Sequence, residues 1–105
     1  MKFLIIATRR HQMPAPPEAL PAIFRSQRDW VREHVDDGTF DVIYGFPYGG
    51  GVAIANADSA EELNSALMFS PAFWLNDWDV RPLLDMDTLL ENVAEALERT
   101  AGVPA

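Results

Sequence analysis

The chain has 105 residues, 49% of them apolar, and carries a net charge of −8 from 16 acidic and 8 basic side chains. A domain of roughly 100–150 residues is the commonest size, so we expect one domain over 1–105. The acidic balance argues against nucleic acid or an anionic membrane as a partner, because both attract basic surfaces. The absence of cysteine excludes disulfides, thiolate nucleophiles and cysteine metal ligands.

The first predicted element is a strand over residues 3–8, a continuous apolar run that is typical of burial on both faces. The run is too short for a signal peptide or a transmembrane helix, so we expect a cytoplasmic protein. Three prolines then indicate a loop over 11–17, and helical spacing predicts a helix over 18–35 that ends at Asp36-Asp37-Gly38. Its apolar face is formed by Leu20, Phe24, Val31 and Val35, with Ile23 and Trp30 beside them.

A hairpin is predicted next, with strands over 40–46 and 52–57 joined by a turn at 47–51. Strict alternation would place Phe40, Val42, Tyr44 and Phe46 on one face of the first of these strands. A helix should begin at Asp58 or Ser59 and end at Ser70-Pro71. Its inner stripe is expected to comprise Leu63, Ala66, Leu67 and Met68.

The last two elements are a strand over 78–84, where Pro82 indicates a sheet edge, and an amphipathic helix over 87–100. The complete order predicts an α+β fold, a ferredoxin-like βαββαβ core over 1–85, with a C-terminal helix and tail over 86–105. The first strand is apolar on both sides, so the sheet face without helices should be apolar too. Pairing two such faces would bury them, which predicts a dimeric α/β barrel, a homodimer or a higher homo-oligomer.

Two segments resemble the muconolactone isomerase-like family of dimeric α/β barrel proteins. One is Asp58-Ser59-Ala60-Glu61-Glu62-Leu63, followed by Leu67-Met68 and Ser70-Pro71; the other is Asp37-Gly38-Thr39-Phe40, similar to the family's Glu-Gly-Thr-Trp junction. The resemblance implies a cofactor-independent 1,3-proton shift in a lactone, with acids of the first helix as candidates. In the matching stretch 26–29 only Asp29 is a carboxylate. The same barrel also serves cofactor-free monooxygenases and polyketide cyclases.

Two residues are predicted to be catalytic. His34 lies one helical turn after Trp30 and can act as an acid or a base near neutral pH; the alternative is a half-exposed histidine that interacts with the helix dipole. Tyr44 can donate a hydrogen bond to a carbonyl or an enolate; the alternative is a core tyrosine with its hydroxyl at the rim. We place the predicted pocket between the first helix and the sheet, walled by Trp30, His34 and Tyr44.

The predicted substrate-binding residues are Trp30, Gln27, Trp78, Asp77 and Arg9. The alternative for Trp78 and Asp77 is a place in an oligomer contact, where tryptophan is enriched. The alternative for Arg9 is that it offsets the acidic surface. His11 and His34 are too scattered for a metal site, and we expect no cofactor.

The predicted function is a small-molecule isomerase or cyclase that uses enolate chemistry on an apolar oxygenated substrate. The alternatives are a cofactor-free monooxygenase and a non-catalytic ligand-binding or assembly protein.

Overall fold

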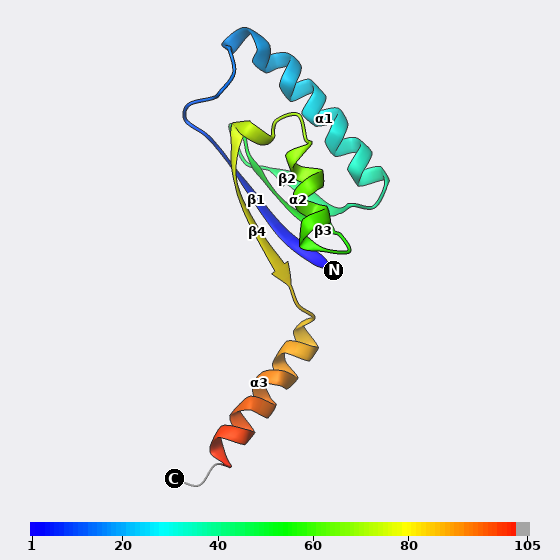
Figure 1. Ribbon diagram of the computed structural model, residues 1–105, viewed down its shortest axis with the longest axis vertical. Coiled ribbons are helices and arrows are strands. Elements are labelled where there is room, and N and C mark those ends of the chain that lie inside the picture. Colours follow the sequence, from blue (N-terminus) through cyan, green and yellow to red (C-terminus); the bar gives the residue numbers. More distant parts are fainter. Residues whose placement is uncertain (103–105) are drawn as a thin grey trace.

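The computed structural model describes residues 1–102, so residues 103–105 of the tail predicted over 102–105 lie outside the described residues. Its sheet has the strand order β2-β3-β1-β4, and all neighbouring strands are antiparallel. This order confirms the ferredoxin-like fold, with α3 added after β4 (Figure 1). The elements are β1 (Lys2–Arg9), α1 (Leu20–Asp36), β2 (Phe40–Gly45), β3 (Gly51–Asn56), α2 (Ala60–Met68), β4 (Asn76–Leu83) and α3 (Met86–Ala101), with 3-10 turns at Pro17–Ala19 and Phe73–Leu75.

The helices begin and end at residues that satisfy their free backbone groups. Ser59 caps α2 by accepting a hydrogen bond from the Glu62 backbone N–H at 3.1 Å. Asp85 caps α3 in the same way, accepting from the Thr88 N–H at 3.0 Å. Gly38 follows the end of α1 with φ of 86°, the left-handed conformation that glycine adopts most easily.

The core lies between one face of the sheet and the helices α1 and α2 (Figure 1). Phe3 and Ile5 of β1 point into it, and Leu63 and Leu67 of α2 pack against them. Met68, which was expected on the same inner stripe, is 44% exposed, so that part of the prediction was wrong. Met68 is the last residue of α2, and its side chain points away from the core that the preceding Leu67 enters.

A β-bulge in β2 changes which side chains face the core. The register shifts between Phe40 and Val42, and an extra residue in a strand reverses the alternation beyond it. Phe40 is therefore buried and Ile43 packs against the core, whereas Val42 and Tyr44 point to the opposite face. The predicted alternation, with Phe40, Val42 and Tyr44 on one face, was wrong for this reason.

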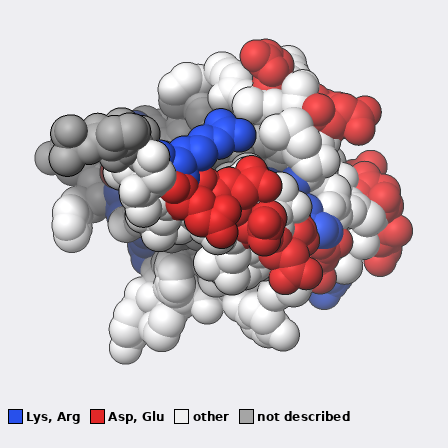
Figure 2. All heavy atoms as spheres, turned by 90° about the horizontal axis from the view of Figure 1, so that it is seen from below, with Lys and Arg blue, Asp and Glu red and all other residues white. Residues whose placement is uncertain are grey.

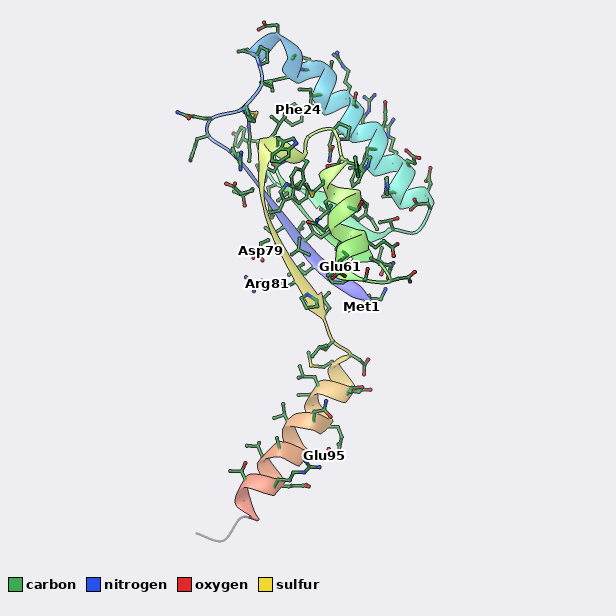
Figure 3. The ribbon with its side chains drawn as sticks, in the orientation of Figure 1. Met1, Phe24, Glu61, Asp79, Arg81 and Glu95 are labelled. Carbon is green, nitrogen blue, oxygen red and sulfur yellow. The ribbon has the colours of Figure 1, made fainter. Side chains whose placement is uncertain are left out.

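The sheet face opposite the helices is uncovered in the single chain and is apolar over its central strands. Pairing across β1, β3 and β2 places the exposed or half-buried side chains of Leu4, Ile6, Val52, Ile54, Val42 and Tyr44 on it. At the β4 edge this face carries an ion pair, Arg81 to Asp79 at 2.9 Å (Figure 3). The edge position of β4 also explains how Pro82 is tolerated within a strand.

The helix α3 extends away from the sheet and from the other two helices, which gives the molecule its long dimension of 68 Å against 30 and 24 Å (Figure 1). Only Leu84 and Asp85 link it to β4. For residues 1–102, no helix is long and apolar enough to cross a membrane.

Candidate functional site

A cavity of about 390 Å³ lies between α1 and the sheet, a volume in the range of small-molecule sites. It is where the sequence predicted a pocket. The residues that border it come from α1, all four strands, α2, the β2–β3 turn and the segment between α2 and β4. They are Ile5, Ala7, Phe24, Gln27, Trp30, Val31, Phe40, Ile43, Tyr44, Gly45, Gly49, Gly50, Gly51, Val52, Ala53, Leu67, Ala72, Asn76 and Trp78.

Small residues at one end of the sheet create this space. Ala7 of β1 and Ala53 of β3 face the first half of α1, and their methyl side chains leave space beneath it. At the other end of the sheet, Phe3, Phe40 and Leu63 fill the corresponding volume. No residue of α1 is fully buried, so the helix rests on the sheet at one end and leaves room beneath it at the other.

Trp30 forms one wall of the cavity and is held in place by His34. The two rings lie 4.2 Å apart between centroids, and Trp30 also meets the edge of Phe40 at 5.6 Å. The Nδ1 atom of His34 lies 2.8 Å from the Trp30 carbonyl oxygen, which can only accept, so Nδ1 donates. His34 does not line the cavity; it supports Trp30 from the side away from it.

Trp78 forms a second wall from β4. Its ring stacks on Phe73 at 5.7 Å, and its indole N–H donates to the Phe73 carbonyl at 2.9 Å. The neighbouring residue, Asp77, points to the other face and pairs with Arg10 at 3.0 Å. Strand alternation therefore brings Trp78 into the site and keeps Asp77 out of it.

Two side-chain amides supply the polar groups of the lining. Gln27 accepts a hydrogen bond from the Ala72 backbone N–H at 2.9 Å through Oε1. Asn76 donates to the Ala72 carbonyl at 3.3 Å through Nδ2. Within residues 1–102, no hydrogen bond engages the Gln27 Nε2 donor or the Asn76 Oδ1 acceptor. Gln27 was among the predicted site residues; Asn76 was not, although its position two residues before Trp78, on the same face of β4, is a usable signal.

Tyr44 and Arg9 stand at the edge of the site. Tyr44 borders the cavity at the end of β2, but it is 71% exposed because of the bulge described above. Arg9 does not line the cavity; its guanidinium donates to the Tyr48 carbonyl at 2.7 Å and its chain lies along Gly49. The structure thus groups Gln27, Trp30, Tyr44 and Trp78 around one cavity and places His34, Asp77 and Arg9 outside it.

The β2–β3 turn closes one end of the cavity. Tyr48, Gly49 and Gly50 all have positive φ, at 69°, 124° and 76°. A Cβ at Gly50 would lie 2.3 Å from the Ala7 carbonyl oxygen, so only glycine fits this close approach to β1. The glycine run is a structural turn, as the sequence indicated, and its backbone forms part of the wall.

The perturbed carboxylates lie outside the cavity. A hydrogen bond from the Thr39 hydroxyl lowers the pKa of Asp37, and a hydrogen bond from Lys2 lowers the pKa of Asp41. Both groups stabilise the chain around the start of β2. In the part of the chain that the structure describes, Tyr44 is the one titratable residue in the lining, and no group of three or more His, Asp or Glu side chains is arranged to hold a metal ion.

Comparison with known proteins gives a fold relationship. No family model matches the sequence. No curated protein matches it either. Among solved structures, muconolactone isomerase is similar with a TM-score of 0.71 and 19% identity, over 81% of this chain and 90% of that one. The fold is that of muconolactone isomerase.

A second solved structure is similar, with a TM-score of 0.57 and 18% identity, over 84% of this chain and 98% of that one. It is 5-chloro-2-hydroxyhydroquinone dehydrochlorinase from Burkholderia phenoliruptrix AC1100 in complex with 2,5-dihydroxybenzoquinone. The resemblance drawn from the two sequence segments is therefore confirmed for the fold. Identities this low leave the reaction open.

Proposed function

We propose that the protein is a small-molecule enzyme that binds an apolar oxygenated compound in the cavity between α1 and the sheet. The reaction we propose is an isomerisation or cyclisation through an enolate, without a cofactor. The observation that carries the proposal is the pairing of an apolar cavity with two free amide groups, Gln27 Nε2 and Asn76 Oδ1. Apolar walls with few convergent polar groups are typical of small-molecule sites.

The lining suits a flat ring that carries oxygen atoms. Trp30 and Trp78 offer aromatic walls from α1 and β4. Gln27 can donate its amide N–H to a carbonyl oxygen, and Asn76 can accept from a hydroxyl group. The similar dehydrochlorinase binds 2,5-dihydroxybenzoquinone, a ring with both kinds of group, which supports this class of ligand.

The same donor can assist the proposed chemistry. Removal of a proton next to a carbonyl leaves negative charge on the oxygen, and a positioned N–H donor stabilises that charge. The hydrogen bond from the Ala72 N–H to Gln27 Oε1 fixes the orientation of the amide, so that Nε2 is positioned to donate. The catalytic roles of His34 and Tyr44 stay predictions. The contacts of His34 favour a positioning role through Trp30, whereas Tyr44 borders the cavity at its rim with a side chain that points to the open sheet face.

One observation favours a second candidate, ligand binding without turnover. The cavity lining within residues 1–102 contains no carboxylate and no imidazole, which are the usual groups for proton transfer. A binding protein needs only the walls and the two amides. Product analysis separates the candidates, since a binding protein leaves the added compound unchanged.

We further propose that the protein assembles through its open sheet face, as a homodimer or a higher homo-oligomer. Leu4 and Ile6 of β1 and Val52 and Ile54 of β3 form a continuous apolar surface there. Burying it against a second sheet would remove it from water, and each 100 Å² of apolar area contributes about 2.5 kcal/mol.

The binding proposal is tested by titrating the purified protein with muconolactone and with 2,5-dihydroxybenzoquinone in a calorimeter and analysing each mixture by chromatography. Ala53→Leu should fill the cavity and abolish binding, because Ala53 lies on its floor and is 5% exposed. The matched control is Ala22→Leu, the same change on the exposed side of α1. Equal binding by the two variants would contradict the proposal.

A further inference from the structure

The helix α3 carries an apolar stripe that the described chain does not cover. Met86, Leu90, Val93 and Leu97 follow the spacing i, i+4, i+7, i+11 on one side, and their exposed fractions are 61%, 57%, 47% and 64%. An isolated helix of about 12–15 residues is only marginally stable in water and depends on packing of its apolar face. Such a stripe on a projecting helix therefore requires a partner surface.

The stripe cannot reach α1 of its own chain. The two-residue link Leu84–Asp85 spans at most about 7 Å. Figure 1 shows α1 and α3 at opposite ends of the molecule, with the sheet between them. A surface that fits α3 must therefore be supplied by another molecule.

The helix α1 offers a matching strip along the border between its sheet-facing side and its outer side. Phe24 is 40% exposed and Val35 is 44% exposed, and Val31 lies half-buried between them. Helical spacing places Arg25, Arg28 and Arg32 along one border of this strip. Glu33 lies on the far side of the helix, and Asp29 pairs with Arg28 at 3.4 Å. Phe24 lies beneath the first half of α1, near the end of the helix that leaves the cavity open (Figure 3).

The stripe of α3 has the opposite charge along its border. Asp87, Glu91 and Glu98 flank it on one side and Glu95 lies behind them, so that acidic side chains form a band at the α3 end of the molecule (Figure 2). Arg99 stands on the other side of the helix.

We propose that α3 of one copy packs antiparallel against the Phe24–Val31–Val35 strip of α1 in a second copy. The spacings agree in a single register. Phe24 and Val31 are seven residues apart, as are Leu90 and Leu97; Arg25 and Arg32 are seven apart, as are Glu91 and Glu98. When each helix is viewed from its N-terminus, its charged border lies on the same side of its apolar strip. When two such strips face each other, the charged borders lie next to one another only if the helices run in opposite directions. Arg25 then faces Glu98, and Arg32 faces Glu91.

The contact would complete the cavity. Phe24 and Val31 line it from α1, and a helix laid over them from a second copy covers the edge where Phe24 is exposed. Water would be excluded from a site whose polar groups are two amides. Ion pairs at a surface add little affinity, so the apolar strips supply the attraction and the charges set partner and direction. The contact uses a different face from the open sheet face, and it does not depend on the ligand.

Cross-linking between single-cysteine chains tests the contact, because the natural sequence has no cysteine. Arg32→Cys chains are mixed with Glu91→Cys chains and treated with a short bis-maleimide. We expect a linked pair of the two different chains. Arg32→Cys mixed with Asn92→Cys is the matched control, since Asn92 lies on the opposite side of α3 and should give little product. Equal yields in both mixtures, or stronger linking of Glu91→Cys chains to one another, would overturn the proposal.

A charge exchange provides the second test, with the Arg32→Cys to Glu91→Cys cross-link as the readout. Arg25→Glu added to the Arg32→Cys chain, and separately Glu98→Arg added to the Glu91→Cys chain, should each lower the cross-linking yield about tenfold, because like charges would then face each other. Mixing the two changed chains restores opposite charges at positions 25 and 98 and should restore the yield. Failure of this restoration, with every variant folded by circular dichroism, would contradict the antiparallel register. Neither test uses a ligand, so their outcome is separate from that of the binding proposal.

Discussion

Replacing Gln27 by glutamate separates the structural role of this side chain from its proposed role in binding. The wild-type Oε1 atom accepts a hydrogen bond from the Ala72 N–H at 2.9 Å. A glutamate carboxylate can accept the same bond, so the packing of α1 against the turn before β4 is kept. The Nε2 donor is lost, and an acceptor takes its place toward the cavity.

The expected loss of affinity follows from that exchange. A missing neutral hydrogen bond costs about 0.5–1.5 kcal/mol, and the ligand oxygen left facing another acceptor brings the total to about 1–3 kcal/mol. Since 1.4 kcal/mol corresponds to a factor of ten, Gln27→Glu should weaken binding of 2,5-dihydroxybenzoquinone by about 5- to 150-fold. The free energy of unfolding should change by less than about 1 kcal/mol, because no hydrogen bond of the fold is lost.

Gln27→Leu is the matched control. It removes both atoms and leaves the Ala72 N–H without its partner, so the free energy of unfolding should fall by about 1–3 kcal/mol. In a domain of this size each kcal/mol lowers the melting temperature by about 4–8 °C. Calorimetric titration and thermal denaturation followed by circular dichroism measure the two effects. Wild-type affinity in a folded Gln27→Glu protein would refute the idea that this amide contacts the ligand.

Three further changes test other parts of the structure. Gly50→Ala should destabilise the fold by at least about 1–3 kcal/mol in urea denaturation, because its Cβ would lie 2.3 Å from the Ala7 carbonyl oxygen; an unchanged midpoint would contradict the close approach. Ile6→Glu should convert the oligomer into monomers in sedimentation equilibrium if the open sheet face is the contact, and a retained oligomer would exclude that face. The lowered pKa of Asp41 means that its ionised form favours the fold, so this contribution is present above the ordinary value of 3.8 and is lost as the pH falls through the folded value. Asp41→Asn should flatten the stability curve in that acid range, and an unaltered curve would show that the Lys2 contact is not stabilising.

The sequence predicted the order of elements because its local signals agree with the packing. Ser59 and Gly38 were predicted at helix ends, and the structure confirms both. Ser59 accepts a hydrogen bond from a free backbone N–H of α2, and Gly38 adopts the positive φ that follows the end of α1. The apolar β1 lies at the centre of the sheet, where the helices cover one of its faces and the other belongs to the open apolar face. Pro82 predicted an edge strand because proline has no backbone N–H to donate to a second neighbouring strand, and β4 does lie at the edge of the sheet.

The parts that were missed depend on features without a local signal. The bulge after Phe40 reverses the faces of β2, and nothing in the alternation of Val42 and Tyr44 reveals it. The cavity exists because β1 and β3, which are distant in sequence, both place an alanine beneath α1, Ala7 and Ala53. Gln27, Trp30 and Trp78 were predicted to bind substrate from the chemistry of their side chains, and the structure places all three at the cavity; their role in binding stays a prediction.

The most direct test of the proposed function is a crystal structure of the protein grown with 2,5-dihydroxybenzoquinone. We predict the ring between Trp30 and Trp78, with one of its oxygen atoms within hydrogen-bonding distance of Gln27 Nε2. A ligand bound elsewhere, or an α1–sheet cavity that stays empty at saturating concentration, would contradict the proposal.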